Sequence, residues 1–488
     1  MKRFFILSFS LLLFAAACFG VGYGIGSAVR ALWGERTVVV LSTNDIHAKI
    51  DNFPRLAAAV EMCRDTVPTV LVDAGDRWTG NAFVDLADEP RRPVIDLMNR
   101  LGYDVGTFGN HEFDPGQAYL DRMVALCDFP VVCANLTSDT ASFVQPKPYA
   151  VVECGGVKLG FLGVVTNYGH NGHPDGNDAC FEGLTFPDPQ QAARDYAARL
   201  AAECDVPIVL SHMGDDKDME LAASTSAYPL VIGGHTHREL DTLVNGVRVV
   251  QTGKNLKNVG VTTLRFRGRR LKSADYRNVP LADYAADPVY DSIVGAIKSN
   301  PVLLAPIGTV AADMDKTAIA AFETRAIAEA TGADVVFYHN GGIRLDRLPA
   351  GGVSTADIYD LEPFSSTAVT VVMTPEQMER MIVAKYNDTK NAKESHRVDL
   401  FSNVPYHIAV DSTGEATGVV FDTLERGRAY RVAMCNYILN NYDEVECREV
   451  CPEEILVTDI LIDYLRRHSP VAFSGRPLQD EWRVTECR

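Results

Sequence analysis

Short runs of hydrophobic and β-branched residues alternate with longer amphipathic stretches between residue 37 and about residue 253. The short runs end in small or polar residues, which is typical of buried strands in a largely parallel sheet. Helical patterns lie between several of them, at Pro54 to Asp65, Pro90 to Leu101 and Pro189 to Glu203. This alternation predicts an α/β architecture in which helices cover a parallel or mixed sheet. The expected strands are 37–45, 69–76, 103–110, 129–136, 157–165, 206–214, 228–235 and 247–253.

The alternation stops between residues 279 and 301, where Pro280, Pro288 and Pro301 bracket a predicted helix around 289–298. We interpret 279–301 as a linker helix between a first domain, 37–278, and a second domain, 302–488. The second domain has an α/β pattern of its own. Its expected elements are a helix at Thr317 to Thr331, a strand at 333–340 and a helix at Pro375 to Tyr386.

The first 34 residues have the composition of a targeting segment. A short positive start, Met1-Lys2-Arg3, precedes an uncharged apolar run that ends at Arg30. The run is long enough to cross a bilayer and would then be an uncleaved anchor. The small residues before Cys18 also fit a lipoprotein signal with a lipidated cysteine. Either interpretation predicts an exported protein, periplasmic or at the cell surface, with its N-terminus attached to a membrane.

The composition excludes some partners. The chain has 488 residues, 47% of them hydrophobic, and a formal net charge of −18. So acidic a protein is repelled by nucleic acid polymers and by anionic lipid surfaces. A small anionic substrate remains compatible with this charge, because bound divalent cations can reverse the field inside a cleft. The 11 cysteines are irregularly spaced, so bridging among Cys447, Cys451 and Cys487 and isolated buried thiols are both open interpretations.

Residues that can bind metal ions follow the predicted strands. Asp45 and His47 are two positions apart at the end of the first strand, so they point to the same side in an extended segment. Asp76 follows a glycine that lets the chain turn sharply after the next strand. Asn110 lies in a Gly-Asn-His-Glu turn after the third. Each motif alone is compatible with an ordinary surface turn, but their recurrence at successive strand ends indicates a shared site.

Histidines complete the pattern. His212 ends a later strand, and His235 and His237 lie two positions apart in a Gly-Gly-His-Thr-His sequence after the next. Ligands in open α/β sheets bind beyond the carboxyl ends of the strands, where all of these residues are expected. Neutral imidazoles favour manganese, iron, cobalt, nickel or zinc over magnesium or calcium. The sequence therefore predicts a transition-metal or zinc site.

The order of these motifs, D-x-H, G-D, G-N-H-E, H and G-H-T-H, resembles that of the calcineurin-like metallophosphoesterases. The sequences TNDIH and GNHEFD resemble their 5′-nucleotidase branch, of the bifunctional UDP-sugar hydrolase type. The resemblance covers nearly all of the chain after residue 37. It implies an N-terminal αββα sandwich, a C-terminal α/β substrate-specificity domain and two divalent metal ions. By resemblance, one ion is bound by Asp45, His47, Asp76 and His237, and the other by Asp76, Asn110, His212 and His235.

The same resemblance implies hydrolysis of a nucleotide phosphate monoester by a water molecule that the metal ions activate. His111 is similar to the family's catalytic histidine, and Asp114 would orient it. In the second domain, Asn340 and Arg344 belong to a turn that resembles the family's N-G-G-x-R sequence. We interpret the nearby Pro363-Phe364 turn as structural.

Two aromatic residues are expected to hold the base of the substrate. Phe401 aligns with a family phenylalanine that stacks on the base, although Asn403 replaces an expected glycine. The second family aromatic is replaced by Val445, and Tyr442 is open to two interpretations: a substitute for that aromatic in the substrate site, or a buried tyrosine of the core. These departures leave three related activities open on the same metal cage: a UDP-sugar pyrophosphatase, a 2′,3′-cyclic phosphodiesterase and a thiosulfohydrolase. A catalytically vestigial surface binding protein is the alternative from another class.

Overall fold

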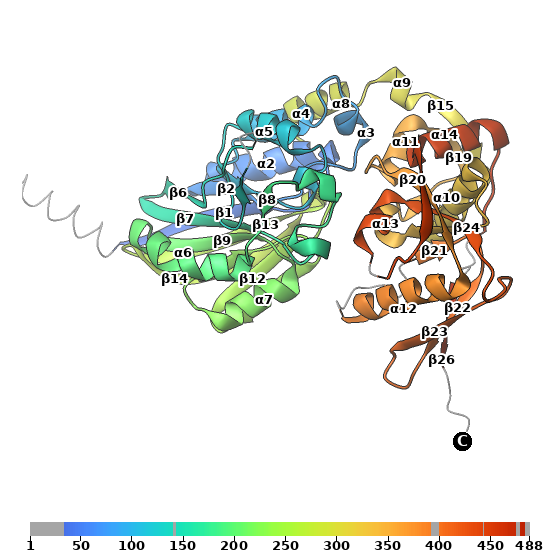
Figure 1. Ribbon diagram of the computed structural model, residues 1–488. Helices are drawn as coiled ribbons and strands as arrows, with labels where there is room; N and C mark the ends of the chain where they lie inside the picture. The colour runs from blue at the N-terminus through green and yellow to red at the C-terminus, as the bar shows by residue number, and fades with distance from the viewer. Residues whose placement is uncertain (1–33, 140–142, 392–399, 443, 475–478, 484–488) are drawn as a thin grey trace, which may run out of the picture.

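The protein consists of two α/β halves that lie side by side, joined at one end by α8 and α9 (Figure 1). The computed structural model describes residues 34–139, 143–391, 400–442, 444–474 and 479–483. The segment predicted to be a signal or anchor therefore lies outside the described residues, except for Gly34. Among the helices of the described part, none is both long and apolar enough to cross a membrane.

Two six-stranded mixed sheets form the first half. In the first sheet β1 to β4 run parallel, and β13 pairs antiparallel with β1. In the second sheet the parallel strands are β7, β9, β10 and β12, and antiparallel strands lie at both edges. In spatial order the first sheet contains β14 (Arg270–Pro280), β13 (Asn258–Arg267), β1 (Glu35–Thr43), β2 (Thr69–Asp73), β3 (Val105–Thr107) and β4 (Val131–Val132). The second contains β11 (Glu239–Val244), β12 (Val247–Thr252), β10 (Leu230–Ile232), β9 (Val206–His212), β7 (Val157–Val165) and β6 (Tyr149–Cys154).

Alternation along the strands builds three hydrophobic layers. Val38 and Val40 of β1 pack with Ile208 and Leu210 of β9 in the layer between the two sheets. The residues between them point outwards, because side chains alternate faces along a strand. Thus Val39 packs beneath the helices of the first sheet. Val209 packs beneath those of the second. This arrangement is the expected αββα sandwich. The covering helices are α2 (Phe53–Arg64), α4 (Arg92–Leu101) and α5 (Gln117–Ala125) on one side, and α6 (Pro189–Glu203) and α7 (Asp215–Ser224) on the other.

The linker packs against the first half. Strand β14 extends two residues into the expected linker, and α8 (Pro288–Ile297) lies against α2, with Val294 buried in the hydrophobic layer there. Asp287 caps α8 by accepting hydrogen bonds from the N–H groups of Val289 and Tyr290. After α9 (Pro301–Leu304) the chain enters the second half.

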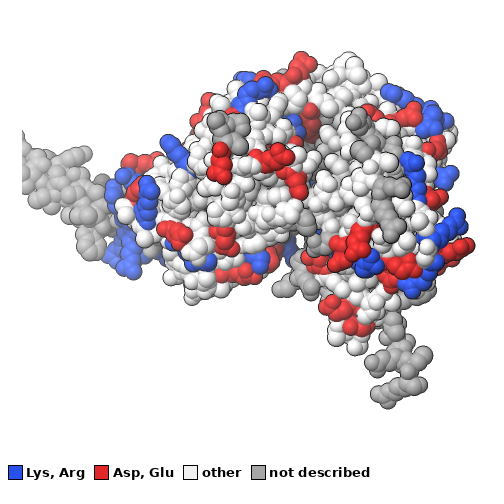
Figure 2. Space-filling model, in the orientation of Figure 1, with Lys and Arg blue, Asp and Glu red and all other residues white. Residues whose placement is uncertain are grey.

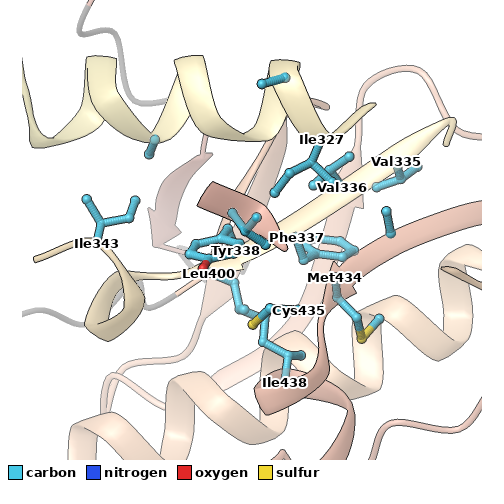
Figure 3. Close-up of a cluster of buried hydrophobic side chains, with 14 of the residues drawn as sticks. Ile327, Val335, Val336, Phe337, Tyr338, Ile343, Leu400, Met434, Cys435 and Ile438 are labelled. Atoms are coloured by element: carbon cyan, nitrogen blue, oxygen red, sulfur yellow. The ribbon is translucent and has the colours of Figure 1, made fainter. Parts of the chain in front are cut away.

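A five-stranded mixed sheet in the order β21-β17-β24-β20-β25 forms the centre of the second half. Its core contains Phe337 and Tyr338 of β17, close to Met434 and Cys435 of β24 (Figure 3). The sheet strands are β17 (Val335–His339), β20 (Thr367–Met373), β21 (Leu400–Ser402), β24 (Tyr430–Cys435) and β25 (Arg448–Leu456). A smaller sheet contains β22 (Tyr406–Val410), β23 (Ala416–Phe421) and β26 (Gln479–Arg483), and short pairs join β15 (Pro306–Val310) to β19 (Gly351–Ser354) and β16 (Met314–Asp315) to β18 (Arg347–Leu348). The helices are α10 (Lys316–Thr331), α11 (Thr355–Leu361), α12 (Pro375–Asn391), α13 (Asn436–Asn441) and α14 (Val457–His468).

The two halves contact each other through a small apolar cluster and an ion pair. Phe83 of the short helix α3 (Ala82–Asp85) packs with Leu303 and Ala356. Lys49 of the first half donates to Asp360 of α11 over 3.0 Å. The described cysteines, which include Cys447 and Cys451, are free thiols, whereas Cys487 lies outside the described residues.

A buried carboxyl in the second half is expected to lower the stability of the protein. Glu323 of α10 is fully buried, and neither of its side-chain oxygens has a hydrogen-bond partner. The Tyr338 hydroxyl donates to the neighbouring Glu362 instead. Burial, together with the charge of Glu362, raises the pKa of Glu323 well above 4.5. Glu323 therefore stays protonated in the folded protein at pH values where the unfolded chain ionises, so the stability it contributes falls as pH rises above about 4.5.

Replacing Glu323 with methionine is expected to stabilise the protein by about 1–3 kcal/mol at pH 7.5, because it removes an unsatisfied buried polar group. At pH 5 the gain is expected to be smaller, because protonating Glu323 as the chain folds then costs less free energy than it does at pH 7.5. Denaturant unfolding at both pH values measures the two gains. Glu61→Met, at an exposed position of α2, is the matched control. Equal gains at the two pH values would contradict this account.

Candidate metal centre and active site

The side chains predicted to bind metal ions lie at the carboxyl ends of strands from both sheets. Asp45 and His47 follow β1, Asp76 follows β2, and Asn110 follows β3. His212 is the last residue of β9, and His235 and His237 follow β10. Because the two sheets pack face to face, these strand ends meet at one edge of the sandwich.

The two aspartates lie at the centre of the cluster. His212 Nε2 is 3.1 Å from Asp76 Oδ2 and 3.8 Å from Asp45 Oδ1. His237 Nε2 is 3.4 Å from Asp45 Oδ1 and 2.9 Å from His47 Nε2. Possible ligand atoms lie within 4.8 Å of one another in three overlapping groups. The groups are Asp45 with His47 and His237, Asp45 with Asp76 and His212, and Asp76 with His47 and His111. Each aspartate thus belongs to two groups, whereas the resemblance implies that Asp76 alone is shared.

Asn110 and His235 form the remaining corner. Asn110 Oδ1 lies 3.1 Å from His235 Nδ1, and the backbone N–H of His235 donates to the Asp45 carboxylate. The other ring nitrogen of His235, Nε2, is 3.6 Å from a carboxylate oxygen of Asp175. All seven predicted ligands are therefore close together, and Asp175 joins them from a loop that the sequence analysis did not single out.

Tight backbone turns aim these side chains. Asp45, His47, Asp76, His235 and His237 have φ values of 50°, 48°, 55°, 80° and 58°. This left-handed region is uncommon for residues other than glycine and is found most often where surrounding structure enforces it. Gly109 is required at the next turn, because a Cβ there would lie 2.2 Å from Asp76 Oδ1. The chain thus folds back after each strand, and the side chains converge.

Glu112 holds two of the turns in place. It is fully buried and accepts hydrogen bonds from the N–H groups of Asp76, Arg77 and Gly109. The buried Arg77 guanidinium donates to Asp73 over 3.2 Å and to the carbonyl of Thr107. The Gly-Asp and Gly-Asn-His-Glu turns are therefore tied to each other through one buried carboxylate.

The electrostatics of the cluster suit a cation. Burial opposes protonation of His212, but the carboxylates of Asp76 and Asp45 outweigh it and raise its pKa to about 10. The Nδ1 of His212 lies 2.7 Å from the Ala74 carbonyl, so Nδ1 carries a proton and Nε2 faces the carboxylates. That Nε2 is buried without a hydrogen-bond partner. The negative charge that favours a proton on Nε2 would also favour a divalent metal ion in its place, with imidazole and carboxylate as its ligands.

His111 and Asp114 form a pair beside the cluster. Their Nδ1 and Oδ2 atoms are 3.0 Å apart, and the backbone N–H of His111 donates to Asp76 over 2.9 Å. Burial lowers the pKa of His111, but Asp114 and Asp76 reverse this effect and raise it to about 9. The Phe364 ring stacks on the imidazole, with centroids 5.3 Å apart. The Pro363-Phe364 turn, which we interpreted as structural, therefore contributes directly to the site.

A cavity of about 370 Å³ opens between the two halves beside His111. Arg344 reaches it from the second half, with its guanidinium 5.5 Å from the centre of the Phe364 ring. Residues of the first half line one side: Asn110, His111, Phe113, Asp114, Asp175, Gly176, Asn177, Cys180 and Phe181. Residues of the second half line the other: His339, Gly341, Arg344, Phe364, Ser365, Ser366, Asn436, Tyr437 and Asn440.

Three of the four predicted substrate-binding residues do not line this cavity. Asn340 is buried in the turn after β17, and Phe401 packs against the core of the second half. Tyr442 is also buried, and its ring faces the Lys385 ammonium 4.8 Å away. Tyr437 lines the cavity but was not predicted from the sequence. It closely follows a buried strand, as the predicted metal ligands do, so its position could have drawn attention to it.

Comparisons with known proteins agree with the two halves. Residues 38–239 match the model of the calcineurin-like phosphoesterases, and residues 296–448 match the 5′-nucleotidase C-terminal domain. The chain is 25% identical to the protein UshA of Yersinia enterocolitica, over 82% of this chain and 84% of that protein. Its fold is similar to a 5′-nucleotidase precursor from Thermus thermophilus, with a TM-score of 0.77, 21% identity and coverage of 91% and 99% of the two chains. It is also similar to the sulfate thiohydrolase SoxB from Thermus thermophilus, with a TM-score of 0.75, 15% identity and coverage of 91% and 96%.

Proposed function

Because this chain belongs to the 5′-nucleotidase family of calcineurin-like metallophosphoesterases and is a metal-dependent phosphoester hydrolase, we propose that it hydrolyses nucleoside monophosphates. The observation that carries this proposal is the convergence of three features on one cavity. The His111–Asp114 pair and the Arg344 guanidinium line the cavity, and the cluster of carboxylates and imidazoles adjoins it through Asn110, which lines the cavity and contacts His235. Together they offer sites for cations, for a proton and for phosphoryl oxygens.

We propose that the seven clustered residues hold two divalent metal ions of the manganese, zinc, cobalt, iron or nickel type. Five of the seven are histidine or asparagine, and imidazole favours these metals. When bound, such ions polarise phosphoryl oxygens and lower the pKa of a water molecule towards neutrality. The ligands would be Asp45, His47, Asp76, Asn110, His212, His235 and His237.

The remaining residues have separate roles in this proposal. His111, which lies between the cluster and Asp114, stabilises negative charge on the phosphoryl group or the departing oxygen. Asp114 orients the imidazole through Nδ1. The Arg344 guanidinium lines the cavity, and its planar donors suit phosphoryl oxygens.

The charges of the cavity favour a monoester over a nucleotide sugar. Of the described residues that line the cavity, only Arg344 is a lysine or arginine, whereas Asp114 and Asp175 are carboxylates. A second phosphoryl group would add negative charge beside Asp175 without a further guanidinium or ammonium to bind it. Acidic side chains are also spread over both halves on the face in Figure 2, with basic ones interspersed. This distribution supports a small-molecule substrate over a nucleic acid polymer.

We also propose that the protein is exported and attached to a membrane through residues 1–34, on the sequence pattern alone. Sequencing the N-terminus of the purified protein and labelling with a radioactive fatty acid distinguish a lipidated Cys18 from an uncleaved anchor. An unprocessed protein found in the cytoplasm would contradict export.

The substrate assignment is tested by phosphate release from the purified full-length protein. After a chelator has removed bound metal, we expect loss of activity, and added manganese should restore it. With manganese, AMP should release phosphate faster than UDP-glucose, 2′,3′-cyclic AMP or a thiosulfate ester. Preference for one of those three compounds would identify the corresponding alternative activity. No turnover of any ester would favour the binding protein.

A further inference from the structure

Glu362 is a buried carboxyl that immediately precedes part of the cavity lining. It follows the last residue of α11 and is fully buried. Phe364, Ser365 and Ser366, which come just after it in the chain, line the cavity. We call these three residues the 364–366 turn. Because a glutamate is rarely buried without bonded partners, the contacts of Glu362 indicate what it holds in place.

The contacts of Glu362 join the 364–366 turn to the central sheet of the second half. Its Oε1 accepts a hydrogen bond from Ser366 Oγ over 2.7 Å and one from the Tyr338 hydroxyl over 3.1 Å. Tyr338 is itself fully buried in β17 (Figure 3). Burial raises the pKa of Glu362 to about 7, and hydrogen bonds from both hydroxyls and from the backbone N–H groups of Phe364 and Ser366 oppose this shift. One carboxyl therefore ties the turn to the sheet.

The backbone of the 364–366 turn requires such a restraint. Ser365 has a φ of 54°, in the left-handed region that is costly for residues other than glycine. The groups that bond to Glu362 belong to Phe364 and Ser366, which flank this residue on both sides. Without the carboxyl, the turn is free to relax towards an ordinary conformation.

The 364–366 turn carries the ring that contacts the catalytic side chains. Phe364 stacks on His111 with centroids 5.3 Å apart and planes inclined by 22°. The Arg344 guanidinium lies 5.5 Å from the centre of the same ring, and the backbone N–H of Arg344 donates to the Leu361 carbonyl over 2.8 Å. A change in the turn would therefore displace the surface against which the His111 imidazole is held.

We propose that Glu362 is a positioning residue, which holds the 364–366 turn so that the Phe364 ring stays stacked on His111 and fixes the orientation of the imidazole. The effect on turnover rests on the proposed function, whereas the effect on the stacked ring does not. Glu323 offers a comparison within the same half. It is also fully buried, but neither of its side-chain oxygens has a hydrogen-bond partner.

The first test observes His111 directly by nuclear magnetic resonance. The full-length protein carries isotope-labelled histidines and is loaded with zinc, which is diamagnetic, and the His111 resonance is identified by its absence from His111→Ala. The ring current of Phe364 shifts this resonance, so Phe364→Leu shows its position without stacking. Glu362→Met is expected to move the resonance towards that position, because the methionine sulfur is only a weak acceptor.

Two variants serve as controls for the resonance. Glu323→Met makes the same replacement at the unbonded carboxyl and should leave the His111 resonance in place. Glu362→Gln keeps an accepting oxygen and should also leave it close to its original position. An unmoved resonance in Glu362→Met would overturn the inference, whatever the protein hydrolyses. If Glu362→Met does not fold, Ser366→Ala removes the bond from the side of the turn, and an unmoved resonance in that variant overturns the inference instead.

The second test measures turnover of AMP with manganese. Glu362→Met is expected to lower kcat by about 3- to 30-fold, less than the factor of about a hundred that a 1 Å misplacement can cost. Glu323→Met and Glu362→Gln should change kcat by less than about twofold. The double variant of Glu362→Met with Phe364→Leu should be at most about twofold slower than the slower single variant, because both act through one ring.

The outcomes of the second test separate the inference from the proposed function. Losses that multiply in the double variant would show that Glu362 and Phe364 act independently, which overturns the inference and leaves the proposed function intact. If the unmodified protein hydrolyses no ester, the proposed function fails, and the His111 resonance alone decides whether Glu362 holds the stacked ring.

Discussion

Replacing Asp76 with alanine is expected to lower turnover by at least about a thousandfold and to remove bound metal, the largest effect of any single substitution in the site. Metal ions supply several kcal/mol of transition-state stabilisation, and each 1.36 kcal/mol corresponds to a factor of about ten in rate. Asp76 belongs to two of the three groups of possible ligands, and one of its oxygens is 3.1 Å from His212. Its loss therefore affects ligands of both proposed ions.

Asp76 also has a structural role that the experiment must separate. Its other oxygen accepts the backbone N–H of His111, which alanine would leave unpaired. Asp76→Asn keeps an oxygen at this position and removes the charge, so it should lose metal while the fold is retained. Metal content by mass spectrometry and turnover of AMP are measured together, with the exposed Asp65→Ala as control. An Asp76→Ala protein with two bound ions and undiminished turnover would eliminate Asp76 as a shared ligand.

Replacing His111 with alanine is expected to lower turnover by at least about a hundredfold while metal content stays unchanged. A positioned acid or base typically contributes a factor of about 10² to 10⁴. The substitution is selective, because the contact between His111 and Asp76 is made by the backbone N–H, which alanine keeps. It removes the imidazole, its bond to Asp114 and its stacking on Phe364.

Two further variants separate these contributions. Phe364→Leu removes the stacked ring but leaves the imidazole, so its loss of turnover should be much smaller than that of His111→Ala. Asp114→Asn keeps the side-chain shape but weakens the hold on Nδ1, and its loss should lie between the two. Turnover and metal content are measured for all three proteins. If His111→Ala retains full activity, His111 has no catalytic role.

The arrangement of the first half could be predicted because its buried strands carry a strong local signal. Runs such as 37–45 and 206–214 are β-branched and end in polar residues, and they correspond to β1 and β9. Of the edge strands, β11 and β14 were missed because they lack such runs. In β11 partly buried residues alternate with exposed ones, and the strand is recognisable only beside its partner β12. Conversely, the apolar segment 129–136 forms only the two-residue strand β4.

The candidate site also has a part that could be predicted from the sequence and a part that could not. Asp45, Asp76 and the histidines could be predicted to meet, because parallel strands of packed sheets share an edge. The cavity lining could not be predicted from the sequence, because loops from distant parts of the chain form it. The loop with Asp175 and Phe181 has no periodic pattern, and part of its position comes from Gln117, whose side-chain amide donates to the Cys180 carbonyl over 3.2 Å. The place of Tyr437 in the lining likewise depends on the parallel pairing of β17 with β24, which brings it beside His339.

The left-handed backbone at five of the seven candidate ligands has a consequence for the life of the protein in the cell. Residues held in such conformations cost about 1–3 kcal/mol each. Cations that bind only the folded chain would offset this cost, since binding to the native state shifts the folding equilibrium in its favour. Chains synthesised under metal starvation would therefore be more susceptible to proteases and to heat than chains from metal-replete cells. Supply of the ion would then govern how much of the protein accumulates, as well as its catalytic activity.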